Sequence, residues 1–186
     1  DIYKLTAEVE KLKLRGRFTD VRMWAVVKLG LGSGLRVSEL AKLQHKDLKL
    51  YGWRAAIFVR RGKGGKSRTV YVSDQTKSII EEYIVWKQKR KLSADEEAYF
   101  FTVQNGKPLS KKTIQDAYHD FAERIGIAKT AIHCLRHTFA SFLLVGGAEI
   151  VFVQEQMGHA DIQTTREYLT VIDFRIDQEH NRMKKK

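Results

Sequence analysis

The chain has 186 residues, which is about one domain and is enough to bury a sizeable hydrophobic core. Its 34 Lys and Arg residues outnumber its 22 Asp and Glu residues, so the formal net charge is +12. A hydrophobic content of 43% argues against a wholly disordered basic tail. The charge favours a polyanionic partner such as nucleic acid or an anionic membrane surface, although ordinary basic proteins share it.

Cys134 is the only cysteine, so the chain cannot form an internal disulfide, which suits a reducing compartment. No stretch of the sequence has the pattern of a membrane span or a signal peptide. We therefore expect a cytoplasmic protein. Because the chain begins with Asp1 rather than Met, we also expect it to be a fragment that lacks an N-terminal portion.

The N-terminal part of the chain has apolar residues at helical spacing. They predict three helices, at about 6–14, 20–31 and 37–44, the first of them capped by Thr6. The run GLGSGLR, residues 30 to 36, separates the second helix from the third, because closely spaced glycines end a helix and permit a sharp turn. Arg36 is therefore expected at the start of a helix, directly behind a turn.

The next segment changes from helical to strand periodicity. RAAIFVR and RTVYV are short β-branched and aromatic runs on either side of GKGGKS, which predicts a β-hairpin with a glycine-rich tip. YFFT at 99–102 is a candidate third strand. Between them, SDQTKSIIEEYIVWKQKRK predicts an amphipathic helix with Ser73 or Asp74 as its N-cap.

The C-terminal part is predicted to be helical. Ser110 can cap a helix that runs to Ile125, and further helices are expected at about 134–145, 149–157 and 161–169. Phe139, Phe142 and Phe152 follow helical spacing, so we expect them in the core. The predicted fold class is α+β, mostly helical, with a small antiparallel β-sheet.

Two glycine-rich motifs do not support nucleotide binding. The glycines at 30, 32 and 34 have the spacing G-x-G-x-G with no strand before them, so they do not form a dinucleotide fingerprint. GKGGKS resembles a phosphate-binding loop, but that motif needs a glycine at the position of Arg60 and a helix after the loop.

A zinc site is a further alternative. His133 and His137 lie four residues apart on one predicted helix, with Cys134 between them and His159 further along. The stretch HCLRH lacks the glutamate of HExxH, and Arg136 would place a permanent cation beside the metal. The sequence therefore favours His137 as a packed or supporting histidine and Cys134 as a buried, inert thiol.

His133 and Arg136 form the arrangement with the clearest chemical meaning. They are one helical turn apart, so their side chains reach the same point. Two short helices after a Gly146-Gly147 turn could bring His159 and Tyr168 back over that face. These side chains are cationic and hydrogen-donating, so their natural target is an anion.

The ordered motifs of this chain resemble the catalytic domain of the tyrosine recombinases, the family of integrases and Xer-like site-specific recombinases. The matching stretches are GSGLRVSEL, GKGGKSRTVYV, HCLRHTFAS and MGHADIQTTREYL. The resemblance runs from about residue 5 to 170 and implies a tyrosine recombinase-type catalytic domain. It divides the chain into a core, residues 1–170, and a C-terminal tail, 171–186. It also implies that the family's N-terminal core-binding domain is absent from this chain.

The resemblance implies a role for each matching residue. It makes Tyr168 the nucleophile, Arg36 and Arg136 the phosphate clamp, Lys63 the general acid, and His133 and His159 the assisting imidazoles. Glu39 matches an acidic position that supports the first arginine, although a helix-stabilising carboxylate is an alternative. Lys66 competes with Lys63 for the hairpin lysine. Thr170 departs from the family, where a histidine often stands at this position.

The implied chemistry is consistent with these residue types. A phosphodiester under attack becomes a phosphorane with extra charge on its nonbridging oxygens, which two guanidinium groups can stabilise without a metal or cofactor. The implied partner is double-stranded DNA, bound by a tetramer on paired sites although the protein alone is a monomer. The tail either crosses to a neighbouring copy or folds back onto its own domain.

Three other readings remain open. A type IB topoisomerase-like enzyme and a telomere resolvase would share the tyrosine chemistry. A catalytically silent DNA-binding protein would need only the basic charge. Tyr168, which follows His159 closely, disfavours the silent protein, because a binding protein has no need of that phenol.

Overall fold

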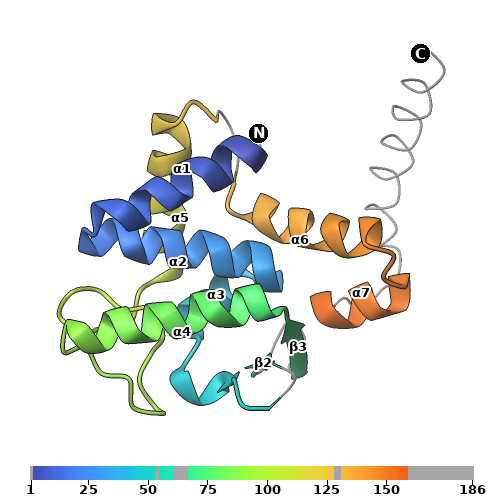
Figure 1. The fold of residues 1–186 in the computed structure, drawn as a ribbon, viewed down its shortest axis with the longest axis horizontal. Coiled ribbons are helices and arrows are strands. Elements are labelled where there is room, and N and C mark those ends of the chain that lie inside the picture. The colour runs from blue at the N-terminus through green and yellow to red at the C-terminus, as the bar shows by residue number, and fades with distance from the viewer. Residues whose placement is uncertain (1, 53–54, 61–66, 128–130, 159–186) are drawn as a thin grey trace.

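The computed structural model describes residues 2–52, 55–60, 67–127 and 131–158 (Figure 1). The helices are α1 Ile2–Arg15, α2 Phe18–Ser33, α3 Val37–Lys42, the short 3-10 helix η1 His45–Asp47, α4 Asp74–Lys89, α5 Lys111–Arg124, α6 His133–Val145 and α7 Ile150–Met157. The strands are β1 Leu48–Lys49, β2 Ala55–Val59 and β3 Arg68–Val72. The predicted fold class, mostly helical with a small antiparallel sheet, is confirmed.

Helix α2 is the centre of the domain. It packs against α1, α4 and α6, and Figure 1 shows it between α1 and α4. Its buried residues include the consecutive run Met23, Trp24, Ala25, Val26 and Val27, whose side chains point in different directions around the helix axis. A helix that is apolar all round is covered on all sides, in contrast to an amphipathic surface helix.

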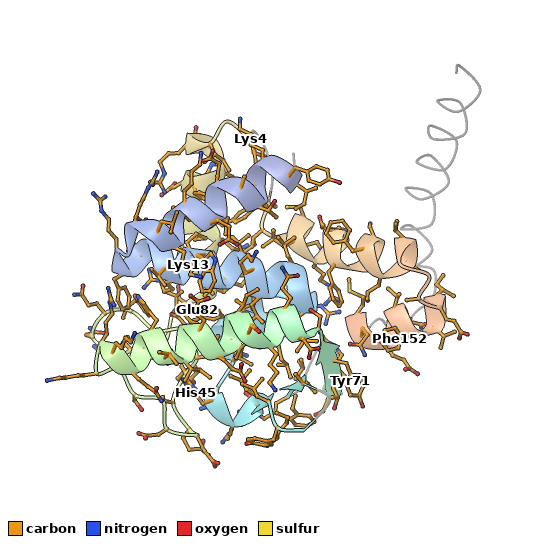
Figure 2. All side chains as sticks on the ribbon, viewed as in Figure 1. Lys4, Lys13, His45, Tyr71, Glu82 and Phe152 are labelled. Carbon is orange, nitrogen blue, oxygen red and sulfur yellow. The ribbon has the colours of Figure 1, made fainter. Side chains whose placement is uncertain are left out.

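An ion pair joins the outer helices α1 and α4, and serine caps stabilise the starts of α4 and α5. The Lys13 ammonium of α1 lies 2.6 Å from the Glu82 carboxylate of α4, and both residues are labelled in Figure 2. The Ser73 hydroxyl accepts a hydrogen bond from the Thr76 amide at the start of α4. Of the two predicted N-caps, Ser73 and Asp74, the structure has Ser73, and the predicted capping of α5 by Ser110 is confirmed.

A buried lysine connects α4 to the loop before the sheet. Lys87 is fully buried, and its ammonium nitrogen lies 2.8 Å from His45 Nε2 and 2.8 Å from the carbonyl oxygen of Tyr99. Burial and the nearby Lys87 charge lower the pKa of His45 to about 4. Burial also lowers the pKa of Lys87 to about 8. At neutral pH the imidazole is neutral and can accept the hydrogen bond from Lys87.

The sheet has the order β1-β2-β3, and both strand pairs are antiparallel. Val59 pairs with Arg68 at the end next to the hairpin tip, and Ala55 pairs with Val72 at the open end. The predicted hairpin strands are confirmed. The third strand was expected at 99–102 but lies at Leu48–Lys49 instead.

Residues 99–102 do not form a strand because their burial does not alternate. Phe100 and Phe101 are both completely buried, whereas successive residues of a strand point to opposite faces of the sheet. Tyr99 and Thr102 make only isolated bridges, to Gln44 and Pro108. The aromatic composition therefore indicated core packing and not strand pairing.

Three further sequence predictions were wrong in position. Thr6 lies inside α1, where its hydroxyl donates to the carbonyl of Ile2, so it does not cap the helix. Phe139 is buried as predicted, but Phe142 and Phe152 are 49% and 39% exposed. Helical spacing predicted that all three rings face the core. The contact between α6 and α7 is a small cluster that includes Phe139, Val153 and Met157, and it does not cover the other two rings.

None of the described helices is long and apolar enough to cross a membrane.

The turn after α2 requires glycine for two reasons. Gly34 has φ +61°, and a Cβ at this position would collide with the ring of Phe139. We expect Gly34→Ala to lower the free energy of unfolding by about 3 kcal/mol, because strain at positive φ of ~1–2 kcal/mol adds to overpacking of ~1–3 kcal/mol. Urea unfolding followed by circular dichroism measures this change.

Gly106 offers a matched control for that substitution. Its φ is +81°, and no described atom lies within 4 Å of a Cβ placed there. Gly106→Ala should therefore show the conformational strain alone, about 1 kcal/mol. Equal losses at both positions would mean that the Phe139 ring moves aside without cost.

Candidate active site

Arg36 stands at the N-cap of α3, directly after the glycine turn, as predicted. Its backbone amide donates to Glu39 Oε2 at 2.8 Å, and its Nη1 donates to Glu39 Oε1 at 3.0 Å. Its Nη2 donates to the carbonyl oxygen of Gly158 at 3.2 Å. The side chain is 20% exposed, so the guanidinium is held by protein groups and still reaches the surface.

Arg136 is a fully buried cation on the second turn of α6. Its side chain donates from Nη1 to the carbonyl oxygen of Gly34 at 2.6 Å and from Nη2 to the carbonyl oxygen of Met157. The residue is 2% exposed. Burial of a charge is unfavourable unless hydrogen bonds compensate it, and here two backbone carbonyls do so.

The C-terminal end of α7 is the point at which the two predicted clamp arginines meet. Arg136 binds the carbonyl of Met157, and Arg36 binds the carbonyl of the next residue, Gly158. The last carbonyls of a helix lack partners within it and carry the negative end of the helix dipole, so they attract cations. Gly158 ends α7 in the left-handed conformation with φ +60°. The structure therefore brings Arg36 and Arg136 to adjacent carbonyls.

A third arginine, which the sequence did not identify, completes this cluster. Arg68 begins β3 and donates from Nε to the carbonyl of Gln156 at 2.9 Å. Its Nη1 and Nη2 donate to the two carboxylate oxygens of Glu39, at 2.8 and 2.9 Å. One sequence signal could have identified Arg68. It is a charged residue in the predicted hairpin, at the position that pairs with the buried Val59.

Glu39 lies between Arg36 and Arg68 and is ionised at neutral pH. Burial alone would raise the pKa of its carboxyl group, but hydrogen bonds and charge from Arg68, together with Arg36, outweigh burial and lower the pKa. The Glu39 side chain is 9% exposed. This carboxylate forms ion pairs with two arginines. It therefore does more than stabilise the start of α3, where it accepts from the Arg36 amide.

His133 lies at the start of α6, on the same helix as Arg136. Its ring is exposed and makes an edge-to-face contact with the ring of His137, with centroids 4.7 Å apart. Partial burial lowers the pKa of His133, and the charges of His137, Arg136 and Arg36 lower it further. The imidazole is therefore neutral at neutral pH, and it is close enough to Arg36 and Arg136 for their charges to affect its pKa.

Two neighbours of His133 differ from their predicted positions. His137 is exposed, so it is not packed in the core, but its ring contacts that of His133, which fits the supporting histidine predicted as the other alternative. Cys134 is half-buried, and its sulfur lies 3.2 Å from the hydroxyl oxygen of Tyr118. Among the residues that the structure describes, no group of three or more His, Cys, Asp and Glu side chains is placed to hold a metal ion.

The remaining predicted site residues lie outside the described residues. These are Lys63 and its competitor Lys66 in the hairpin tip, His159, and Tyr168. His159 directly follows Gly158, whose carbonyl binds Arg36. The hairpin strands that flank Lys63 are described and end at Val59 and Arg68.

An open groove lies beside Arg36 and has a volume of about 640 Å³. Its basic lining residues are Arg36, Lys42 and Arg60, and Asp47 is also in its wall. Arg60 Nη2 lies 2.7 Å from the Asp47 carboxylate, which holds the arginine at the end of β2. Glu39 also lines the groove, so charged groups of both signs surround Arg36 there.

Comparison with known proteins identifies the class of this domain. The model of the Phage integrase family matches residues 2–173, so the chain belongs to the phage integrase family. The fold is that of a tyrosine recombinase catalytic domain. The predicted family and fold are therefore confirmed.

Individual relatives show the extent of the similarity. Tyrosine recombinase XerC of Thermodesulfovibrio yellowstonii is 38% identical over 160 residues, which cover 83% of this chain and 52% of the relative. The crystal structure of XerA recombinase is 32% identical with a TM-score of 0.71, and the match covers 87% of this chain and 57% of that one. The chain thus spans about half the length of the curated relatives it matches.

A third structure shows a related fold together with DNA. XerH site-specific recombinase, bound to palindromic difH substrate in a post-cleavage complex, is 24% identical with a TM-score of 0.76. The match covers 96% of this chain and 50% of that one. At this identity the likeness concerns the fold alone.

Arg136 is buried more deeply than Arg36, so the two predicted clamp arginines should differ in how much they contribute to stability. We expect Arg136→Lys to lower the free energy of unfolding by about 2–3 kcal/mol, because an ammonium cannot donate to both the Gly34 and Met157 carbonyls with this geometry. Arg36→Lys should lower it by about 1 kcal/mol or less, since it loses one long contact to Gly158.

Both lysine variants should nevertheless slow DNA cleavage strongly, because a point charge cannot form two hydrogen bonds to a phosphate with fork geometry. Urea unfolding and single-turnover cleavage, measured on the same preparations, separate the two effects. Full cleavage activity in both variants would place the phosphate clamp elsewhere.

Proposed function

We propose that this chain is the catalytic part of a site-specific DNA recombinase or integrase that cleaves and rejoins DNA through a covalent 3′-phosphotyrosine intermediate. The observation that carries the proposal is the meeting of Arg36 and Arg136 at the last carbonyls of α7. The next residue, His159, begins the segment that contains Tyr168. The carbonyls that hold the two proposed phosphate-binding arginines therefore directly precede the segment that contains the proposed nucleophile.

The proposed reaction begins with attack of the Tyr168 oxygen on a DNA phosphate. The phosphorus–oxygen bond to the 5′-oxygen breaks, and a new phosphoester to tyrosine forms at the 3′ end. Arg36 and Arg136 stabilise the added charge on the nonbridging oxygens. The phenol, with an ordinary pKa near 10, must lose its proton during attack, and the neutral imidazole of His133 or that of His159 can assist.

Lys63 is proposed to protonate the departing 5′-oxygen. The ester to tyrosine conserves the energy of the broken phosphodiester, so a second 5′-hydroxyl can attack it and release Tyr168 without ATP. The guanidinium groups supply the positive charge that a metal ion supplies in other phosphoryl-transfer enzymes, and the proposal therefore includes no metal or cofactor.

The proposed substrate is double-stranded DNA. The net charge of +12 and the groove beside Arg36, with Lys42 and Arg60 in its wall, support this choice. A XerH site-specific recombinase that is 25% identical to this chain and was solved with difH substrate in a pre-cleavage complex also supports it. Because DNA is the substrate, the proposal places the protein in the cytoplasm.

Tyr168→Phe should abolish the covalent protein–DNA adduct and leave DNA affinity nearly unchanged, because the change removes one oxygen atom and keeps the ring. The adduct is measured on a denaturing gel after incubation with nicked suicide DNA. An adduct that persists in the variant would exclude Tyr168 as the nucleophile. A wild-type chain that binds DNA but forms no adduct would favour the silent DNA-binding protein.

A supercoiled plasmid distinguishes recombination from topoisomerase activity. The proposed recombinase should exchange strands between two copies of its site. A type IB topoisomerase should relax plasmids that contain no such site.

The hairpin lysines can be separated with a modified leaving group. Lys63→Ala should slow cleavage of ordinary DNA and recover substantially when the 5′-oxygen is replaced by sulfur, because a thiolate departs without a proton. Lys66→Ala is the matched control in the same hairpin and should show no selective recovery. Recovery in Lys66→Ala alone would assign the general acid to Lys66.

We further propose that residues 1–170 form the catalytic core and that the tail, 171–186, links copies of the protein in a tetramer on paired DNA sites. The tail sequence contains apolar Phe174 and Ile176, which require cover. The α6–α7 edge also exposes apolar side chains, including Val145 at 57% and Val151 at 52%. Exposed apolar groups of this kind often mark contact surfaces between proteins.

Truncation after Thr170 should leave single-site cleavage measurable while reducing assembly on two-site DNA and removing strand exchange. The reason is that the active-site residues remain, whereas the proposed link between copies is lost. Analytical ultracentrifugation with two-site DNA, together with a recombination assay, compares the intact and truncated chains. Equal assembly and equal recombination by both would assign the tail to its own domain.

A further inference from the structure

Arg68 occupies a central position in the site, although neither the motif roles nor the proposed mechanism uses it. We propose that Arg68 is a positioning residue for DNA cleavage, which binds Glu39 so that the guanidinium of Arg36 stays available to the scissile phosphate. This inference rests on the proposed function. It adds a residue that acts through Arg36 and does not touch the substrate.

Arg68 is held mainly by protein groups, because all three nitrogens of its guanidinium donate a hydrogen bond within the domain. Nη1 and Nη2 donate to the two oxygens of Glu39, and Nε donates to the carbonyl of Gln156. The side chain is 11% exposed. Arg36 differs, since the described residues receive hydrogen bonds from only its Nη1 and Nη2. Its remaining N–H groups can serve a ligand.

The carboxylate of Glu39 is fully occupied by these two arginines. Oε1 accepts from Nη1 of Arg36 and Nη1 of Arg68, while Oε2 accepts from the Arg36 amide and Nη2 of Arg68. A carboxylate has about four acceptor positions, so this arrangement uses its full capacity. Arg68 forms the two-point contact with Glu39, and the Arg36 side chain forms a single contact with it.

The charges explain why that division matters. Without Arg68, the buried Glu39 carboxylate would have Arg36 as its remaining cationic partner in this cluster. A buried charge without sufficient partners is costly, so Arg36 would turn to form the two-point pair with Glu39. The donors that a phosphate needs would then point at the carboxylate. Arg68 prevents this by satisfying Glu39 first.

Arg68 is itself held rigidly by β3 and α7. The buried side-chain oxygen of Gln156 accepts from the Tyr71 amide at 2.8 Å, which fastens α7 to β3 beside Arg68. Gly158 packs so closely on the arginine that a Cβ there would lie 2.8 Å from Arg68 Cδ. These contacts fix the geometry of the Glu39 pair and give Arg68 the rigidity that a positioning residue requires.

The test compares two scissile groups, an ordinary phosphodiester and a methylphosphonate in which one charged nonbridging oxygen is replaced by methyl. Arg36 has less charge to neutralise on the methylphosphonate. Arg68→Met should slow single-turnover cleavage of the phosphodiester about 30-fold, and Arg36→Met about 100-fold or more, on the scale of losing one charge-stabilising donor. On the methylphosphonate, each loss relative to wild type should shrink to about 3-fold.

A second arm removes the carboxylate that would capture Arg36. Adding Glu39→Gln to Arg68→Met should restore phosphodiester cleavage by about 10-fold relative to Arg68→Met, because a neutral amide holds Arg36 weakly. Arg90→Met is the matched control, since that arginine donates to the Gly16 carbonyl and covers the Trp86 ring on another part of the domain. Arg90→Met should cleave both substrates at wild-type rates.

The outcomes are distinguishable. Unchanged cleavage by Arg68→Met, or an equal loss on both substrates with no recovery in the double variant, would overturn the positioning role and leave the proposed function standing. A wild-type chain that forms no adduct on either substrate would overturn both. If Arg68→Met does not fold, Arg68→Lys keeps the charge but not the two-point contact. That variant should show a smaller loss that also shrinks on the methylphosphonate, and an equal loss on both substrates would reject the role.

Discussion

The contact between three arginines and the last carbonyls of α7 is the interaction on which the site depends. Arg68, Arg136 and Arg36 bind the carbonyls of three consecutive residues, 156, 157 and 158. Like charges repel strongly in a partly buried environment, so such a cluster forms only where anionic or dipolar groups compensate it. The helix end supplies one compensation and Glu39 supplies another.

The rest of the fold keeps these three arginines in register. Arg36 comes from the turn after α2, Arg136 from α6, and Arg68 from the sheet, so the contact joins distant parts of the chain through α7. Gly34 contributes twice, because it permits the turn before Arg36 and its carbonyl binds Arg136. The central helix α2 packs against α6 and β3, which fixes the distance between these parts.

Local signals made part of this structure predictable. The glycine turn before Arg36 and the serine caps at Ser73 and Ser110 depend on neighbouring residues, and the structure has them as expected. Arg68 could not be identified, because its partners, Glu39 and the end of α7, are distant in sequence. The exposed ring of Phe142 shows the same limit, since periodicity gives the face of a helix but not what covers it.

The charge of the cluster has a consequence for the proposed chemistry. Three guanidinium groups and one carboxylate leave a net charge of +2 around the point where Arg36 reaches the groove. A phosphodiester carries one negative charge, whereas the phosphorane formed during attack carries more on its nonbridging oxygens. In the proposed reaction, the cluster therefore matches the transition state better than the bound substrate, which is the condition for lowering a barrier. Arg136 is buried, whereas Arg36 is partly exposed, so Arg36 is the arginine whose contacts can change when a ligand binds. In the proposed mechanism, Glu39 and Arg68 together determine how much of the Arg36 charge is available to the DNA.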